Sequence, residues 1–187
     1  IHSFKGIGKI PKKVNKLSQV KTQKLLNDLP MYLKGIGRTL ESMPGKKAIF
    51  VILDSDDADC AELKKDLVEM YEKSGVTVDV YFCIAIEEME AWLLGDEKAI
   101  EEAYPQAKMP LLRKYVQDSI VGTWEYLADV VYSGGVNALK KKAESYYEIG
   151  LFKCECAGNI GMYLNIHENK SPSFNYFINK LNDFCEV

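Results

Sequence analysis

The chain has few of the residues that build disulfide scaffolds, zinc sites or membrane spans. Of its 187 residues, two are histidine and five are cysteine. An odd number of scattered cysteines excludes a regular disulfide framework and is typical of a reducing cytoplasm. Cys154 and Cys156 form one close pair, but no second Cys or His pair lies at zinc-finger spacing, so no zinc site is expected. The longest apolar run, residues 48–53, is too short to cross a bilayer, so we expect a cytoplasmic protein without a membrane partner.

Positive charge is concentrated at the start of the chain. The net charge is −3, but the first fifty residues carry eleven Lys and Arg against two acidic residues. A basic segment ahead of an acidic body is typical of a protein that holds a phosphate backbone beside a metal centre. A solvated surface on which lysines gather by chance is the alternative, and the acidic pI of about 5.5 favours it. In the first interpretation, the nucleic-acid contacts come from four lysines: Lys5, Lys9, Lys12 and Lys13.

Two segments have the pattern of buried β-strands. Residues 48–53 form a continuous apolar, β-rich run, which is typical of a central parallel strand buried on both faces. Residues 76–86 alternate between apolar and polar before they become fully apolar. Between them an amphipathic segment follows Asp59 and ends near Gly75, which predicts a helix. Strand, helix and strand together predict one parallel βαβ unit.

The remaining segments are expected to be mainly helical. Residues 1–4 are interpreted as the end of a strand, and two helices are expected before residue 48, one from Pro11 and one over residues 29–40 with a break near Pro30. After Asp96 the helical segments are 97–104, 124–131, 136–147, 152–164 and a last helix that begins at Ser171-Pro172. The predicted fold class is therefore α/β, with a core over residues 1–96 and a helical covering region, not an independent domain, over residues 97–187.

A first acidic group follows the first predicted strand. Asp54, Asp56 and Asp57 lie where an open α/β sheet gathers its ligands, at the carboxyl end of a strand. Closely spaced carboxylates repel one another, and Mg²⁺ (or Mn²⁺) relieves that repulsion through carboxylate oxygens. We therefore expect a magnesium site that serves phosphoryl transfer. The alternative is a helix cap, which accounts for Asp57 or Asp59 but not for Asp54 and Asp56, because a cap needs one oxygen.

A second acidic group follows the second predicted strand. It contains Glu87, Glu88 and Glu90, and on a helix Glu87 and Glu90 share one face. If the two strands are neighbours, this group opens beside Asp54, and Glu87 is the expected additional metal ligand. Taken alone, the group is explained more simply by a solvated helix start rich in glutamate.

Four blocks in this order resemble a bacterial and archaeal family of uncharacterised proteins. They are Phe-Lys-Gly at 4–6, Leu-Asp-Ser-Asp at 53–56 with Cys60 shortly after, Glu-Ala-Trp-Leu-Leu-Gly-Asp at 90–96 and Asn-Lys-Ser-Pro-Ser-Phe at 169–174. The family looks Toprim-like, which is the metal-binding α/β fold of topoisomerases, primases and overcoming-lysogenisation-defect nucleases. The resemblance implies an ABC-type ATPase as a partner and a role in antiviral defence against phage.

The resemblance also implies roles for individual residues. Asp54 and Asp56 match the Toprim Asp-x-Asp metal ligands, and Glu90 matches a later glutamate with a metal or acid–base role. Toprim folds carry a further catalytic glutamate at the end of a preceding first strand. We expect that strand and one helix to lie ahead of Ile1 in the natural chain.

The expected function is Mg²⁺-dependent phosphodiester cleavage of DNA or RNA, with Asp54, Asp56 and Glu90 as the catalytic residues. A first alternative is a metal-binding or regulatory subunit of an ATPase that cuts nothing itself. A second is a haloacid-dehalogenase-like phosphatase, which also opens with a strand and Asp-x-Asp. That family has Thr or Val two residues after the second Asp, where this chain has Ala58.

Overall fold

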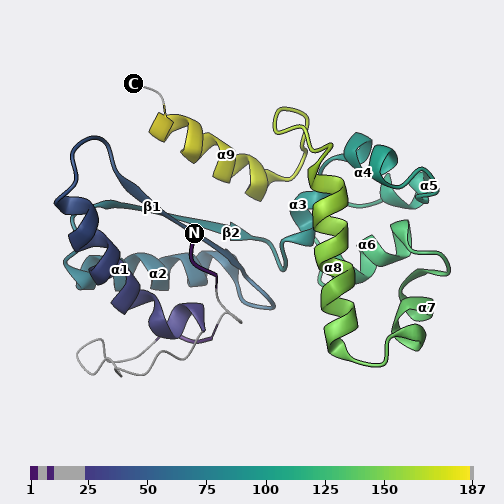
Figure 1. Ribbon diagram of the computed structural model, residues 1–187, viewed down its shortest axis with the longest axis horizontal. Coiled ribbons are helices and arrows are strands. Elements are labelled where there is room, and N and C mark those ends of the chain that lie inside the picture. Colours follow the sequence, from purple (N-terminus) through teal and green to yellow (C-terminus); the bar gives the residue numbers. More distant parts are fainter. Residues whose placement is uncertain (4–7, 11–23, 186–187) are drawn as a thin grey trace. The chain divides into compact units, whose positions relative to one another are not determined.

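The computed structural model describes residues 1–3, 8–10 and 24–185, which form a mixed α/β structure that is mostly helical. It divides into two compact units (Figure 1). The first unit comprises Ile1–Leu53 and Ala58–Ile84, and the second comprises Asp54–Asp57 and Ala85–Val187. The division thus falls at the ends of two strands, whereas the sequence pattern predicts a boundary after Asp96.

The first unit is a two-stranded parallel sheet with two helices on one side (Figure 1). Its elements are α1 (Leu25–Glu41), β1 (Ala48–Asp54), α2 (Cys60–Ser74) and β2 (Asp79–Ala85). Apolar residues from all four elements form one core, which includes Leu29, Leu33, Val51, Leu67 and Phe82. The predicted parallel strand–helix–strand unit is confirmed.

The apolar run predicts that β1 is buried on both faces, but in the structure only one face is buried. Ile49, Val51 and Leu53 belong to or pack against the core, while Ile52 is 41% exposed. The difference arises because α1 and α2 both pack on the same face of the sheet (Figure 1), and their apolar residues form one core with Val51 and Leu53. Residues 1–3 form no strand, and the last residue of the strand predicted there lies outside the described part.

α1 is longer and more regular than its sequence predicts. It continues through Pro30 and Gly35, where a break is expected. Pro30 lies in the second turn, so its missing N–H costs the helix one hydrogen bond. Burial of Leu29, Leu33 and other apolar residues on one face outweighs that loss. The helix predicted from Pro11 lies outside the described residues.

α2 begins and ends where its sequence signals predict. The Asp59 carboxylate accepts a hydrogen bond of 2.9 Å from the backbone N–H of Glu62, which caps the helix. Gly75 follows with a φ of 69°, a left-handed conformation that glycine adopts without steric cost. α2 therefore forms the connection between the parallel strands β1 and β2.

The second unit is helical. Its helices are α3 (Glu90–Leu94), α4 (Glu97–Ala103), α5 (Met109–Leu112), α6 (Thr123–Val131), α7 (Gly135–Lys142), α8 (Tyr146–Gly161) and α9 (Pro172–Cys185). Its largest core cluster includes Leu94, Ile100, Leu127, Cys156 and Ile160. Five of these helices confirm predicted helical segments with shifted bounds. The helix predicted over residues 136–147 ends at Lys142, and α8 already begins at Tyr146, six residues before its predicted start. No helix in the described part of the chain has the length and apolar character that crossing a membrane requires.

Candidate functional site

The loops that follow β1 and β2 are hydrogen-bonded to each other. The N–H of Ser55 donates to the carbonyl of Ala85 at 3.0 Å, and the N–H of Asp56 donates to the carbonyl of Glu87 at 2.9 Å. The Ser55 hydroxyl in turn accepts a hydrogen bond of 2.7 Å from the Glu87 N–H. Asp56 and Glu87 have φ values of 46° and 60°, which are uncommon for residues other than glycine. These bonds bring the two predicted acidic groups to one edge.

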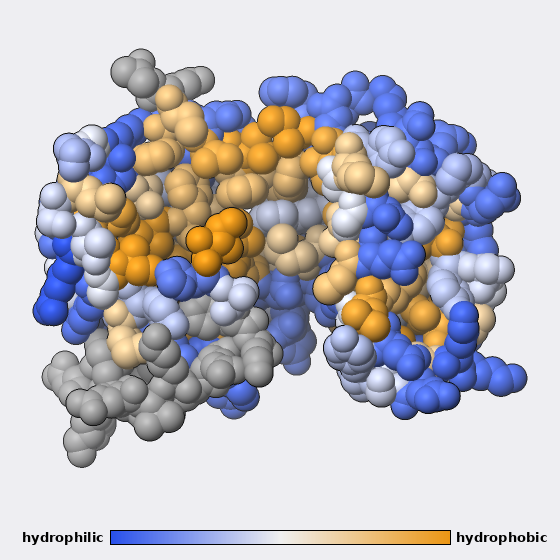
Figure 2. Space-filling view, viewed as in Figure 1, coloured by the Kyte–Doolittle hydropathy of each residue, from blue (hydrophilic) through white to orange (hydrophobic). Residues whose placement is uncertain are grey.

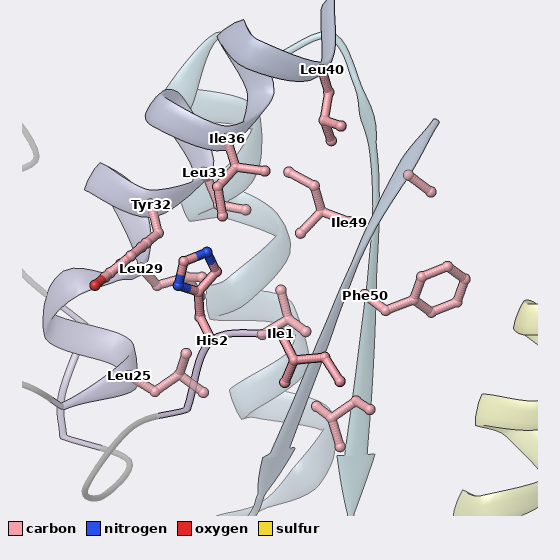
Figure 3. A pocket seen from close by; sticks show the side chains of 13 residues that line it. Ile1, His2, Leu25, Leu29, Tyr32, Leu33, Ile36, Leu40, Ile49 and Phe50 are labelled. Atoms are coloured by element: carbon pink, nitrogen blue, oxygen red, sulfur yellow. The ribbon is translucent and has the colours of Figure 1, made fainter. Parts of the chain in front are cut away.

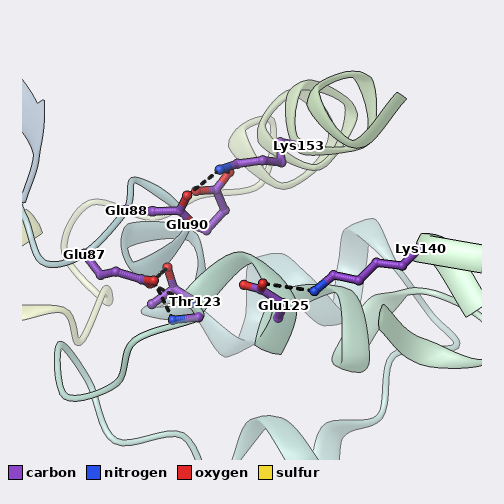
Figure 4. Close-up of polar contacts among 8 residues, drawn as sticks. Glu87, Glu88, Glu90, Thr123, Glu125, Lys140 and Lys153 are labelled. Carbon is purple, nitrogen blue, oxygen red and sulfur yellow. Dashed lines mark hydrogen bonds and ion pairs between the residues drawn. The ribbon is translucent and has the colours of Figure 1, made fainter. Parts of the chain in front are cut away.

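Asp54, Glu88, Glu90 and Lys153 form the candidate site, which we call the carboxylate–lysine cluster. Lys153 Nζ lies 2.9 Å from Glu88 Oε1 and 3.4 Å from Glu90 Oε1 (Figure 4). Glu90 is only 6% exposed. Two buried oxygens, Asp54 Oδ1 and Glu88 Oε2, have no hydrogen-bond partner in the described structure. Buried carboxylate oxygens without donors are stabilised by a cation or a proton.

Burial changes the proton affinity of this cluster. It raises the pKa of Asp54 from 3.8 to about 6, and the charges of Glu90 and Glu88 add to the effect while Lys153 opposes it. Burial likewise raises the pKa of Glu90, although Lys153 partly offsets the shift. Burial acts to lower the pKa of Lys153, but its two glutamate partners outweigh burial and the pKa is raised. The lysine therefore stays charged, and Asp54 exchanges its proton near pH 6.

Glu87 has a different environment. Its carboxylate accepts hydrogen bonds from the backbone N–H of Gly122 and from the N–H and hydroxyl of Thr123, the last two at 2.6 Å (Figure 4). These donors lie at the start of α6, where the helix dipole favours an anion. The expected helix face shared by Glu87 and Glu90 is not formed, because α3 begins only at Glu90. A metal-ligand role for Glu87 stays a prediction, and these hydrogen bonds argue against it.

The other predicted site residues lie at the surface or outside the described part. Asp56 and Asp57 are exposed, and the charge of Asp56 contributes to the raised pKa of Asp54. Lys9 is exposed, and its N–H donates to Asn27 Oδ1 at 3.0 Å. The remaining predicted nucleic-acid contacts, at positions 5, 12 and 13, fall outside the described residues.

Two members of the cluster had no predicted role. Glu88 belongs to the second acidic group, but helical spacing selects Glu87 and Glu90 as the expected site residues. Lys153 lies in α8, sixty-three residues after Glu90 in the chain, and a single lysine on a helix carries no signal in the sequence. Its role depends on the packing of α8 beside α3. Within residues 1–3, 8–10 and 24–185, no three His, Cys, Asp or Glu side chains are grouped as metal ligands.

The Glu-x-Trp and Asn-x-Ser-x-Ser-Phe blocks bond to each other and position Glu90. Asn169 Nδ2 donates to the carbonyl of Trp92 at 2.8 Å, and Trp92 Nε1 donates to the hydroxyl of Ser173 at 2.8 Å. A Cβ atom at Gly95 would overlap the Asn169 side chain, so glycine is required there. These contacts link α3, which begins with Glu90, to the start of α9. The two blocks therefore have a structural role around the cluster.

A family model described as Domain of unknown function (DUF4276) matches residues 1–182. The chain belongs to this family. The predicted membership of an uncharacterised family is thereby confirmed. Searches of curated proteins and of solved structures gave no match for this DUF4276 chain.

The first unit has a separate apolar groove of about 370 Å³ between α1 and β1 (Figure 3). Figure 2 shows hydrophobic residues at the surface over these two elements. His2 lies at the groove, with its ring 5.5 Å from that of Tyr32. The lining is otherwise apolar, with no acidic or lysine side chain among the described lining residues. The groove therefore lacks the charged groups that the expected chemistry requires.

Proposed function

We propose that this DUF4276 protein is a Mg²⁺- or Mn²⁺-dependent phosphodiesterase that cleaves nucleic acid. The carboxylate–lysine cluster is the observation that carries the proposal. It gathers three carboxylates where two parallel strands end, and two of their buried oxygens have no donor. Ligand sites of α/β sheets lie at such strand ends.

Two carboxylates of the cluster offer oxygens of the type that a hard divalent cation prefers. Mg²⁺ prefers carboxylate oxygens and water as ligands. The carboxylate oxygens of Asp54 and Glu88 that have no hydrogen-bond partner are ligands of this type. In the proposal these two residues hold the ion, and the exposed Asp56 and Asp57 contribute through water. A bound divalent ion supplies positive charge that stabilises phosphoryl transfer.

The protein's own groups supply the remaining chemistry. Asp54, with a pKa of about 6, is ionised above that pH and available as a ligand. Glu90, whose pKa burial raises, is placed to hold and move a proton, as a general acid or base does. Lys153 reduces the repulsion among the carboxylates and offers a positive charge to a phosphate.

The motif resemblance supports a wider context for this activity. In the proposal the fold is Toprim-like, an ABC-type ATPase is the partner, and the protein acts in the cytoplasm in defence against phage. The basic segment that begins with Lys5 and Lys9 holds the phosphate backbone, and the substrate is DNA or RNA.

Cleavage assays test the proposal directly. Plasmid DNA and a structured RNA are incubated with the full-length protein and Mg²⁺ or Mn²⁺, and wild type is compared with Asp54→Ala. Asp66→Ala, an exposed change on α2, is the matched control. We expect cleavage by wild type and the control, and a loss of at least about 100-fold in Asp54→Ala. Equal cleavage by all three proteins excludes the proposed site.

One observation favours a second candidate, a non-catalytic metal-binding or regulatory subunit of an ATPase. Lys153 already neutralises part of the charge of Glu88 and Glu90, which leaves less negative charge for a catalytic metal ion. In that case co-purification with an ATPase and stabilisation by Mn²⁺ are expected without cleavage.

A further inference from the structure

We propose that the second unit binds unpaired bases of single-stranded nucleic acid at the corner between α7 and α8. We call this surface the aromatic–lysine corner and define it by Trp124, Lys140, Lys141, Lys142, Tyr146 and Tyr147. The choice of a nucleic acid as the ligand rests on the proposed function. The corner is distinct from the carboxylate–lysine cluster and shares no residue with it.

Two adjacent tyrosines at this corner are unusually exposed. Tyr146 is 91% exposed and Tyr147 is 74% exposed, at the start of α8. Tyrosine usually buries part of its ring, because the ring is large and mostly apolar. Two exposed rings on consecutive residues therefore present stacking surfaces, and bases stack on aromatic side chains irrespective of sequence.

A hollow of about 400 Å³ adjoins Tyr146, whereas Tyr147 does not line it. It is lined by Trp124, Lys140, Tyr146 and four further residues from Ala143 to Ile149, which include Glu144. Lys140 Nζ lies 4.9 Å from the centroid of the Trp124 ring. It also lies 3.2 Å from Glu125 Oε1 (Figure 4). The lysine thus lies over one aromatic wall of the hollow. Aromatic walls with a few polar groups suit a planar, partly polar ring such as a base.

Three consecutive lysines end α7, immediately before the residues from Ala143 onward that line the hollow. Lys141 and Lys142 are exposed, and neither forms an ion pair with another residue that the structure describes. Exposed lysines beside stacking rings match a chain whose phosphates alternate with bases. An acidic peptide would satisfy the lysines, but it would leave the exposed rings and the aromatic hollow without a matching group.

Binding in EDTA tests the inference without cleavage. A fluorescein-labelled oligo(dT) of about 20 nucleotides is titrated with the full-length protein, and anisotropy is measured. We expect Tyr146→Ala/Tyr147→Ala to weaken binding about tenfold or more, because each stacked base contributes measurably to affinity. Tyr163→Ala, which changes another exposed tyrosine (49%), is the matched control and leaves affinity unchanged.

The lysines are tested by the dependence of binding on salt. Changing Lys140, Lys141 and Lys142 to Gln is expected to reduce the slope of log K against log salt by about 0.7 for each phosphate that the variant no longer neutralises. The control makes the same change in charge on α2, where Lys64, Lys65 and Lys73 are changed to Gln. In wild type, oligo(dT) is expected to quench the fluorescence of Trp124. Trp124→Phe removes that signal, since the other tryptophan, Trp92, is only 5% exposed.

Three results overturn the inference: tyrosine and lysine variants that bind like wild type, a preference for blunt duplex over oligo(dT), or equal competition by poly-glutamate. Circular dichroism confirms that each variant is folded, and Tyr147→Ala alone provides a milder change.

If the protein cleaves nucleic acid but these variants bind normally, the inference fails and the proposed function stands. If binding depends on the corner but no cleavage occurs, the proposed function fails instead.

Discussion

Asp54→Asn is expected to stabilise the protein at neutral pH. Burial, with the charges of Glu90 and Glu88, raises the pKa of Asp54 from 3.8 to about 6, and its Oδ1 has no donor. The folded state therefore binds the Asp54 proton more tightly than the unfolded state does. Stability from this residue is present below about pH 4 and is lost as the pH rises to about 6. Asparagine has the same shape and carries no charge, so it avoids that loss.

The size of the effect follows from the pKa shift. A shift of about two pH units corresponds to about 3 kcal/mol, at about 1.4 kcal/mol per unit. Asp54 is only partly buried, and the new amide also needs hydrogen-bond partners, so we expect a gain of about 1–2 kcal/mol at pH 7.5. At pH 4.5 the gain should be much smaller, because most of the aspartate is protonated in the folded state.

Urea unfolding at both pH values measures this difference. Asp57→Asn is the matched control, since Asp57 is exposed, and it should change the free energy of unfolding by less than about 0.5 kcal/mol. The reasoning is refuted if Asp54→Asn destabilises the protein equally at both pH values. In the proposed function this more stable variant is inactive, because it has lost a metal ligand.

Three further changes test separate contacts. Lys153→Met should lower the free energy of unfolding by about 2–3 kcal/mol at pH 7.5, because it leaves buried carboxylates without a cation. Thermal melts compare it with Lys98→Met, which removes an exposed ion pair and should cost much less; equal losses would contradict the burial argument. Glu87→Gln should weaken the start of α6 by about 1–3 kcal/mol, seen as faster amide hydrogen exchange there, and unchanged exchange would exclude a capping role. Asn169→Ala should destabilise α3 by about 1 kcal/mol by removing its bond to the Trp92 carbonyl, and a variant as stable as wild type would show that the bond contributes nothing.

Local signals in the sequence predict most of the elements. β1, α2 and β2 follow from apolar runs, an Asp cap and a terminal glycine, which act within a few residues. The start of α9 is predicted in the same way, and the Ser171 hydroxyl accepts a hydrogen bond of 3.2 Å from the N–H of Phe174. α1 differs because the burial of its apolar face outweighs the local effect of Pro30.

The candidate site is predicted only in part. Asp54 and Glu90 are both expected near a strand end, and the structure brings them into one cluster. Which glutamate joins them depends on the left-handed conformation of Glu87, which turns its side chain to α6 and leaves Glu88 beside Lys153. No short pattern encodes that conformation. Lys153 is contributed by tertiary packing, which spacing within one segment does not reveal.

Titration of the full-length protein with Mn²⁺ at pH 7.5, followed by isothermal calorimetry, tests the central claim most directly. If Asp54 and Glu88 hold a divalent ion, wild type binds Mn²⁺, Asp54→Asn binds it at least about tenfold more weakly, and Asp66→Asn binds like wild type. Equal Mn²⁺ binding by wild type and Asp54→Asn, or no binding by either, would contradict the account.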